Sequence, residues 1–207
     1  MSHRPIMDAG PGLNFFSLNK ERLLFATLGP LAVPEIVEQE IVRKAGQDQR
    51  FEAAGRVLGK IPSRLLEILS DEVTPELAAA VQRLAGVPIE TRMRSSKDLG
   101  EIMVVAHAVV AAERGHRVIV LVDDGGGRKM AMREAARLQR MRESQSDVGG
   151  IWLINTGDVL KKAAGGEHLP DRNSMRDLYG KLRTLDDGLT PLERTGLMDL
   201  PCWSQLK

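Results

Sequence analysis

One stretch of the sequence decides the fold class: Arg117-Val118-Ile119-Val120-Leu121-Val122-Asp123-Asp124-Gly125-Gly126-Gly127. Its apolar part is mostly β-branched and has no polar interruption, which is typical of a strand in the middle of a parallel sheet. An acidic pair and three glycines follow, and the glycines indicate a flexible turn. The pattern therefore predicts a central strand with Asp123 and Asp124 at its carboxyl end.

The rest of the chain alternates strand patterns with helix patterns. Short apolar runs predict strands at residues 5–7, 31–33, 87–90 and 150–155. Amphipathic or capped segments predict helices at residues 14–28, from Pro34 onward, at 49–69 as one or two helices, and at 74–85, 99–114 and 128–142. This alternation predicts a three-layer α/β/α sandwich with a mostly parallel central sheet.

The last quarter of the chain has a different character. Residues 156–207 are polar and predominantly helical in pattern, with helices expected at 158–164 and 174–185. We therefore divide the chain into an α/β domain at residues 1–155 and a helical C-terminal extension at residues 156–207 that packs on the same domain. Trp152 is expected in the core, and Trp203 is expected to anchor the tail or meet a partner.

Composition excludes several classes of protein. The 29 basic residues nearly balance the 28 acidic ones, so any attraction to nucleic acid must come from a local patch. The only cysteine is Cys202, which excludes an internal disulfide framework and a multi-cysteine zinc site. Neither a signal peptide nor an apolar run of roughly 20 residues is present in the sequence, so we expect a cytoplasmic protein with no membrane partner.

Acidic residues stand where a parallel sheet places its functional crevice, beyond the carboxyl ends of the strands. Asp8 and Asp123 each follow a predicted strand, and Glu40 and Glu101 lie on helices with strong apolar faces. Four carboxylates in one crevice repel each other unless cations neutralise them, which favours Mg²⁺ or Mn²⁺. The alternative is that these are ordinary solvated surface residues.

Four segments, in order along the chain, resemble the PIN-domain family. These metal-dependent ribonucleases include the VapC-type toxins of bacterial toxin–antitoxin pairs. The segments are Ile6-Met7-Asp8, Val33-Pro34-Glu35-Ile36-Val37-Glu38-Gln39-Glu40-Ile41, Leu99-Gly100-Glu101-Ile102-Met103-Val104-Val105-Ala106-His107-Ala108, and Val120-Leu121-Val122-Asp123-Asp124 followed by Arg128. The resemblance covers residues 5–155, which would form the PIN-like nuclease domain, and the extension fits a longer branch of the family.

The resemblance implies a divalent-metal-dependent endoribonuclease, the toxin of a type II toxin–antitoxin system. Its catalytic acids would be Asp8, Glu40, Glu101 and Asp123, and a metal-bound water would attack the RNA phosphodiester in line. Asp98 lies three residues before Glu101, and Asp124 follows Asp123, so each is an alternative metal ligand. The family also implies neutralisation by a cognate antitoxin protein and assembly as a homodimer.

The predicted helix after the acidic pair is strongly basic. Its cations lie on one face, opposite an apolar one, and we assign substrate binding to Arg128, Lys129, Arg133 and Arg137. Such a stripe is suited to holding the phosphates of RNA beside an acidic site. The alternative is a solvated helix face.

Two other functions use similar residues. One is a PIN fold that has lost catalysis and binds RNA or a protein. The other is a phosphoacceptor domain of the receiver type, which also places aspartates at strand ends. The second is disfavoured because the acidic pair follows a late strand and no suitably placed lysine follows a strand end.

Overall fold

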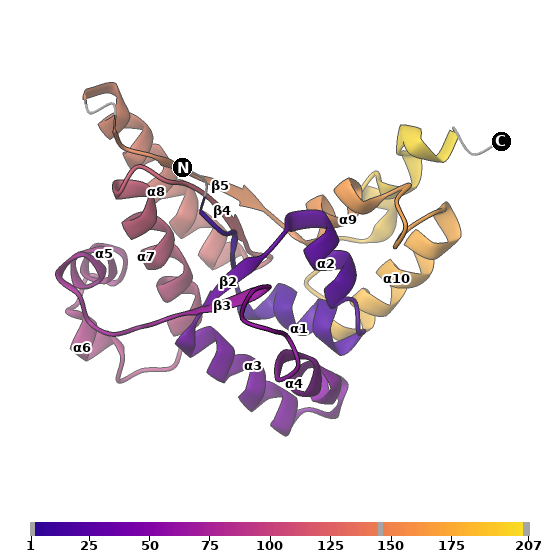
Figure 1. The fold of residues 1–207 in the computed structure, drawn as a ribbon, viewed down its shortest axis with the longest axis horizontal. Helices are drawn as coiled ribbons and strands as arrows, with labels where there is room; N and C mark the ends of the chain where they lie inside the picture. The colour runs from indigo at the N-terminus through magenta and orange to yellow at the C-terminus, as the bar shows by residue number, and fades with distance from the viewer. Residues whose placement is uncertain (1–2, 145–146, 205–207) are drawn as a thin grey trace.

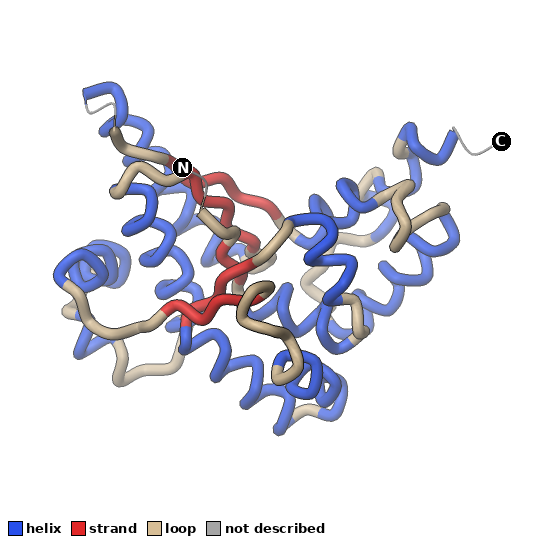
Figure 2. Tube along the Cα trace, viewed as in Figure 1, coloured by secondary structure: helices blue, strands red, loops and turns tan. Residues whose placement is uncertain are grey.

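A parallel sheet forms the centre of the protein in the computed structural model, which describes residues 3–144 and 147–204 (Figures 1 and 2). Within these residues it has five strands in the order β3-β2-β1-β4-β5, and every pairing is parallel. The strands are β1 Ile6–Met7, β2 Leu31–Pro34, β3 Leu66–Leu69, β4 Arg117–Leu121 and β5 Gly150–Ile154.

Helices cover both faces of this sheet. In Figure 1, α5, α6, α7 and α8 lie on one side of the strands, and α2, α9 and α10 lie on the other. The helices are α1 Ala9–Ser17, α2 Glu21–Leu28, α3 Glu35–Gln47, α4 Glu52–Leu58, α5 Pro75–Ala85, α6 Ile89–Arg92, α7 Leu99–Glu113, α8 Gly125–Ser144, α9 Thr156–Ala163 and α10 Arg172–Leu185, with short 3₁₀ helices η1 Gln49–Phe51, η2 Leu192–Arg194, η3 Leu197–Asp199 and η4 Pro201–Ser204. The predicted three-layer α/β/α sandwich is confirmed.

Helix α7 is the hydrophobic centre of one layer. It contacts β1, β2, β4 and β5, and most of its side chains from Leu99 to Ala112 are buried. Because apolar residues occupy nearly every face, this helix cannot lie at the surface. Each fully buried valine or leucine stabilises the fold by about 1.5–3 kcal/mol, so α7 fixes the position of the residues at its N-terminus, including Glu101.

Two predicted elements were wrong in type. The last four residues of the segment predicted as helical at residues 49–69 form strand β3, and the strand predicted at 87–90 is replaced by helix α6. Residues 65–69 have good helix propensity, but pairing with β2 overrides it, because Leu31 N–H donates to the Leu65 carbonyl at 2.8 Å. Pro88 serves as the N-cap of α6, and its carbonyl accepts the first helical hydrogen bonds.

Two glycine-rich segments form the first turns of helices, and one of them is residues 125–127, which were predicted as a flexible turn. Gly10-Pro11-Gly12 opens α1, where a proline costs little because the first N–H groups of a helix have no partner within it. Asn19, at φ 53°, then separates α1 from α2 and divides the single helix predicted at residues 14–28. At Gly125, α8 begins because the Asp124 side chain accepts hydrogen bonds from the N–H groups of Gly126 and Gly127.

Trp152 is not a core residue. It lies on edge strand β5 with 44 % of its surface exposed, on the side of the strand that points away from the buried Ile151. Successive side chains of a strand point to opposite faces, and an edge strand has less cover on its outer face. The prediction that Trp152 is buried was therefore wrong.

The extension packs on the α/β domain. Helix α9 contacts α2, α10 contacts α1, and Leu178, Leu182 and Trp203 belong to the common hydrophobic core. Trp203 anchors the tail, and its indole N–H donates to the Leu197 carbonyl at 2.8 Å. The last residues of the predicted tail, 205–207, lie outside the described residues. Among the residues that are described, no helix combines the length and apolar character needed to cross a membrane.

Candidate functional site

Asp8 and Asp123 lie at the switch point of the sheet, where the order in which the chain adds strands reverses. From β1 the chain proceeds to β2 and β3 on one side, and β4 and β5 then occupy the other side. In such sheets the crevice between the two diverging connections is the usual ligand site. Asp8 follows β1 directly and donates its backbone N–H to the Leu121 carbonyl at 3.0 Å, which holds the ends of β1 and β4 together.

Asp8 is a buried carboxyl group whose negative charge is little offset by nearby positive charge. Its relative exposure is 6 %, and burial raises its pKa to about 6. A hydrogen bond from the Ala9 N–H and the charge of Lys44 oppose the shift, whereas the carboxylates of Glu40 and Asp123 add to it. The negative charge of Asp8 therefore lacks a sufficient counter-charge within the protein.

Glu40 reaches the same place from α3. A Cβ atom placed on Gly100 would lie 2.8 Å from Oε2 of Glu40 and 3.9 Å from Oδ1 of Asp8. A side chain at position 100 would therefore displace Glu40, and glycine is what allows α7 to come this close. The other Glu40 oxygen, Oε1, pairs with Lys44 Nζ at 2.8 Å.

Glu101 and Asp124 form a second acidic pair. A Cβ atom on Gly126 would lie 2.9 Å from Oδ1 of Asp124 and 3.1 Å from Oε2 of Glu101. Burial raises the pKa of Glu101 to about 7, and the charges of Asp124, Asp8 and Asp98 add to the shift. Oδ1 of Asp124 already accepts two backbone N–H groups as the cap of α8.

Asp123 is held by the start of the extension. Its two oxygens accept hydrogen bonds from the Thr156 backbone N–H at 2.8 Å and from the Thr156 hydroxyl at 2.6 Å. Burial nevertheless raises the pKa of Asp123, and Asp186 contributes in the same direction. Each carboxylate oxygen has two lone pairs, so these hydrogen bonds orient Asp123 and leave it able to bind a cation.

Asp98 differs from the other acids. It is exposed, and it occupies the N-cap position of α7 at φ 54° without a side-chain capping hydrogen bond. Its charge raises the pKa of Glu101, so the two carboxyl groups are close enough to interact electrostatically. Glu101 is nevertheless the one of the two that approaches the Gly126 backbone beside Asp124.

The acids are grouped as pairs around one edge of the sheet. Within residues 3–144 and 147–204, no three His, Cys, Asp or Glu side chains stand together as a ready-formed ion-binding group. The donor chemistry nevertheless fits a hard divalent cation, because every candidate ligand is a carboxylate oxygen. The raised pKa values of Asp8, Glu101 and Asp123 indicate negative charge that a cation would neutralise.

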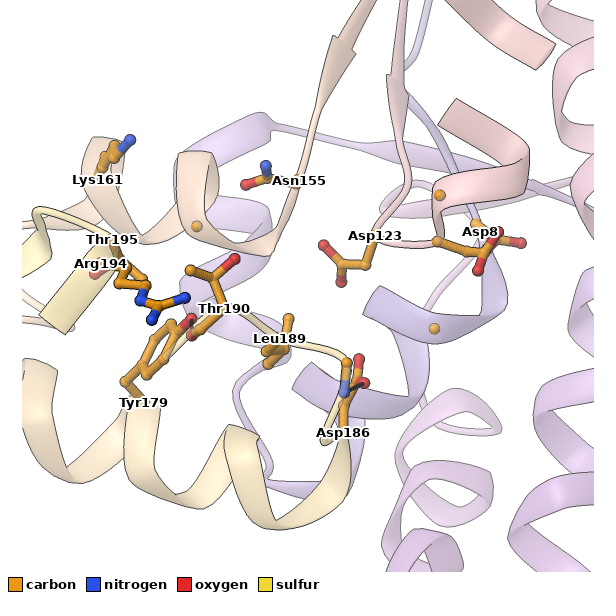
Figure 3. Close-up of a pocket in the computed structure, with 15 residues that line it drawn as sticks. Asp8, Asp123, Asn155, Lys161, Tyr179, Asp186, Leu189, Thr190, Arg194 and Thr195 are labelled. Atoms are coloured by element: carbon orange, nitrogen blue, oxygen red, sulfur yellow. Dashed lines mark hydrogen bonds between the residues drawn. The ribbon is translucent and has the colours of Figure 1, made fainter. Parts of the chain in front are cut away.

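A cavity of about 460 Å³ adjoins these acids and has a second wall formed by the extension (Figure 3). Figure 3 shows Asp123 pointing toward that wall. The α/β domain contributes Asp8, Asp123, Asp124 and Asn155, and the extension contributes Lys161, Tyr179, Asp186, Thr190, Arg194 and Thr195. No role was predicted for the cavity-lining residues of the extension, because no local sequence pattern indicates which face of α9 or α10 turns to the acidic edge.

Asp186 is an additional acid at this site. It ends α10 and lines the cavity, and its Oδ2 accepts a hydrogen bond from the Asn14 amide at 3.1 Å. The charge of Asp186 also raises the pKa of Asp123. Asp186 is 172 positions from Asn14, so only the folded structure brings it to the site.

The cations of α8 divide into two groups. Lys129 and Arg133 are exposed, and Arg128 donates a hydrogen bond from Nη1 to the Val122 carbonyl at 3.4 Å. Arg137, in contrast, is bonded to Glu134 at 2.7 Å and to Glu113 at 2.5 Å. Its charge is neutralised within the protein, so Arg137 is a poor candidate for binding substrate.

Comparisons of the chain with protein-family models, with curated proteins and with solved structures each give no match. The class of the protein is therefore defined by its own fold and site. It is a parallel α/β/α sandwich with paired carboxylates at the switch point of the sheet.

Proposed function

We propose that this protein is a divalent-metal-dependent endoribonuclease in which Asp8, Glu40, Glu101 and Asp123 hold the metal. The observation that carries the proposal is the buried carboxyl of Asp8 at the switch point of the sheet, with its pKa raised to about 6. Carboxylates that the fold buries without a cation of its own are typical of sites that bind one.

The four proposed metal ligands come from two strand ends and two helices. Asp8 and Asp123 supply ligands at fixed positions, because strand ends and the Thr156 hydrogen bonds orient them. Glu40 and Glu101 approach from α3 and α7. When bound, Mg²⁺ or Mn²⁺ would activate a water and stabilise the leaving oxygen of a phosphodiester.

Three exposed or partly exposed cations on α8 support RNA as the substrate. Arg128, Lys129 and Arg133 follow the acidic pair directly and offer positive charge beside an acidic site. For single-stranded RNA, each phosphate contact contributes about 0.7 to the slope of log affinity against log salt concentration. Replacing Lys129 and Arg133 with glutamine should lower that slope by about 1.4, and an unchanged slope would remove α8 from the RNA-binding surface.

The resemblance of four segments to the PIN-domain family is a second support, and it alone suggests a toxin of a toxin–antitoxin pair. A cognate antitoxin and a homodimer rest on that resemblance too, and they stay predictions. The separation of the carboxylates into pairs favours one alternative, a PIN-fold module that binds RNA or a protein without cutting it.

A single experiment separates these two functions. The purified protein and its Asp8→Asn variant are incubated with total RNA, with manganese or with chelator, and new RNA ends are mapped. We expect manganese-dependent ends that are lost in Asp8→Asn and retained in Asp177→Asn, a control at an exposed acid of α10 outside the cavity. Equal cleavage by the Asp8→Asn variant would refute the site, and binding without cleavage would support the inactive module.

A further inference from the structure

We propose that the extension supplies a phosphate-binding wall, in which Lys161 and Arg194 hold the backbone of the RNA strand beside the acidic edge. This inference rests on the proposed function and names a subsite for it. The two cations lie on α9 and η2, outside the basic stripe of α8.

Both cations line the same cavity as Asp8 and Asp123. In Figure 3 they lie on the opposite side of that cavity from Asp123, and the guanidinium of Arg194 extends toward Thr190. One cavity therefore has an acidic wall and a facing wall that carries two cations besides Asp186. A metal on the acidic wall and a guanidinium on the other would each bind one anionic group of the same ligand. A phosphodiester chain is such a ligand, because it carries a negative charge on every phosphate.

The positive charges of Lys161 and Arg194 are available to a ligand. Among residues 3–144 and 147–204, neither forms an ion pair, and both are exposed. Lys44 and Arg50, which line a neighbouring cavity, are instead paired with Glu40 and Asp48. An unpaired guanidinium in a cavity binds phosphate through two parallel N–H donors.

The segment that carries Arg194 is held in place by side chains of α10. The Tyr179 hydroxyl donates to the Thr190 carbonyl at 2.5 Å, and Arg183 donates to the carbonyls of Asp187 and Leu189. Because Tyr179 is buried, these contacts join the segment to the core. A fixed segment loses little conformational freedom when a ligand binds, which favours affinity.

The cavity favours a strand over a single nucleotide. Its volume of about 460 Å³ lies within the usual range for ligand sites, roughly 300–1,000 Å³. It also shares Gly10 and Asp186 with a second cavity of about 520 Å³, which contains Arg43 and Phe51. Two cavities that share wall residues leave room beside the first subsite for further nucleotides of a polymer.

The test compares two double variants that remove the same charge. Lys161→Gln with Arg194→Gln removes the proposed wall, whereas Lys162→Gln with Arg172→Gln removes exposed cations of α9 and α10 that do not line the cavity. Manganese-dependent cleavage of a single-stranded RNA oligonucleotide gives KM and kcat, and fluorescence anisotropy gives its Kd on an Asp8→Asn background. All four positions are exposed, so the melting temperatures should match that of the parent protein.

We expect KM and Kd to rise about 10-fold in the wall variant, with kcat at saturation within about twofold of the wild type, because two phosphate contacts are lost. The salt slope of binding should fall by about 1.4, and the control variant should change neither constant. Equal constants in the two double variants would overturn the wall and leave the nuclease proposal intact. Absence of cleavage by the wild type would refute the nuclease proposal, and the binding arm would still decide the wall.

Discussion

Asp8→Asn should stabilise the protein when no metal is present, although it should abolish cleavage. The carboxyl of Asp8 is buried, and its pKa is raised from 3.8 to about 6 in the folded state. Above pH 7 its ionised form therefore destabilises the fold by about 3 kcal/mol relative to the neutral form. Asparagine has nearly the same shape, keeps an oxygen that can accept from the Ala9 N–H, and carries no charge.

The sign of the pH dependence follows from the direction of this shift. A carboxyl group whose pKa is raised by folding binds more protons in the folded state, so stability is present below pH 4 and is lost as pH rises toward 7. The difference in unfolding free energy between Asp8→Asn and wild type should grow from about 0.5 kcal/mol at pH 4 to about 3 kcal/mol at pH 8. For a chain of this size that corresponds to a melting temperature higher by about 6–12 °C.

Thermal melts from pH 4 to pH 8, with chelator and with manganese, measure this effect. Manganese should stabilise the wild type by about 2.7 kcal/mol at 100 times its Kd, and it should leave Asp8→Asn unchanged. Asp177→Asn, the exposed control on α10, should follow the wild type at every pH. If the melting temperatures of wild type and Asp8→Asn in chelator differed by the same amount at every pH, the reasoning would be refuted, because a buried charge without a counter-charge must show this pH dependence.

Three further predictions concern single contacts. Gly100→Ala should push Glu40 out of the acidic edge and lower cleavage at least about 10-fold, measured as kcat/KM, because the new Cβ would lie 2.8 Å from Oε2. Thr156→Val removes the hydroxyl bonded to Asp123 and should weaken manganese binding by about 10-fold or more in calorimetry, whereas Thr156→Ser should restore it. His107→Ala breaks a partly buried 2.8 Å bond to the carboxylate of Asp71 and should lower the free energy of unfolding by about 1–3 kcal/mol in urea, with kcat unchanged; an equal urea midpoint would contradict this.

The elements specified by a local sequence pattern could be predicted from the sequence alone. The run that ends at Leu121 is β-branched and unbroken, and it became β4 in the middle of the parallel sheet. Asp8 and Asp123 follow strands, so their place at one sheet edge could be predicted from the fold class alone. Burial of α7 was likewise evident from its continuous apolar composition.

The rest required tertiary information. Strand β3 has helix propensity and forms a strand because the edge of β2 offers hydrogen bonds. Trp152 is apolar yet exposed, since a single sequence does not show that β5 is an edge strand. Lys161, Asp186 and Arg194 are ordinary polar residues of a polar segment, and only the packing of α9 and α10 brings them to the cavity.

Because of strand β1, assembly of the acidic edge depends on how much of the chain has been synthesised. Its two residues pair with Val120 and Leu121, and Asp8 N–H bonds to the Leu121 carbonyl, across more than half of the chain. Contacts so distant in sequence form only after the intervening segment has been made, and a chain leaves the ribosome from its N-terminus. The aspartate made first must therefore wait for β4 to emerge, so a nascent chain cannot assemble the acidic edge until most of the protein has been translated.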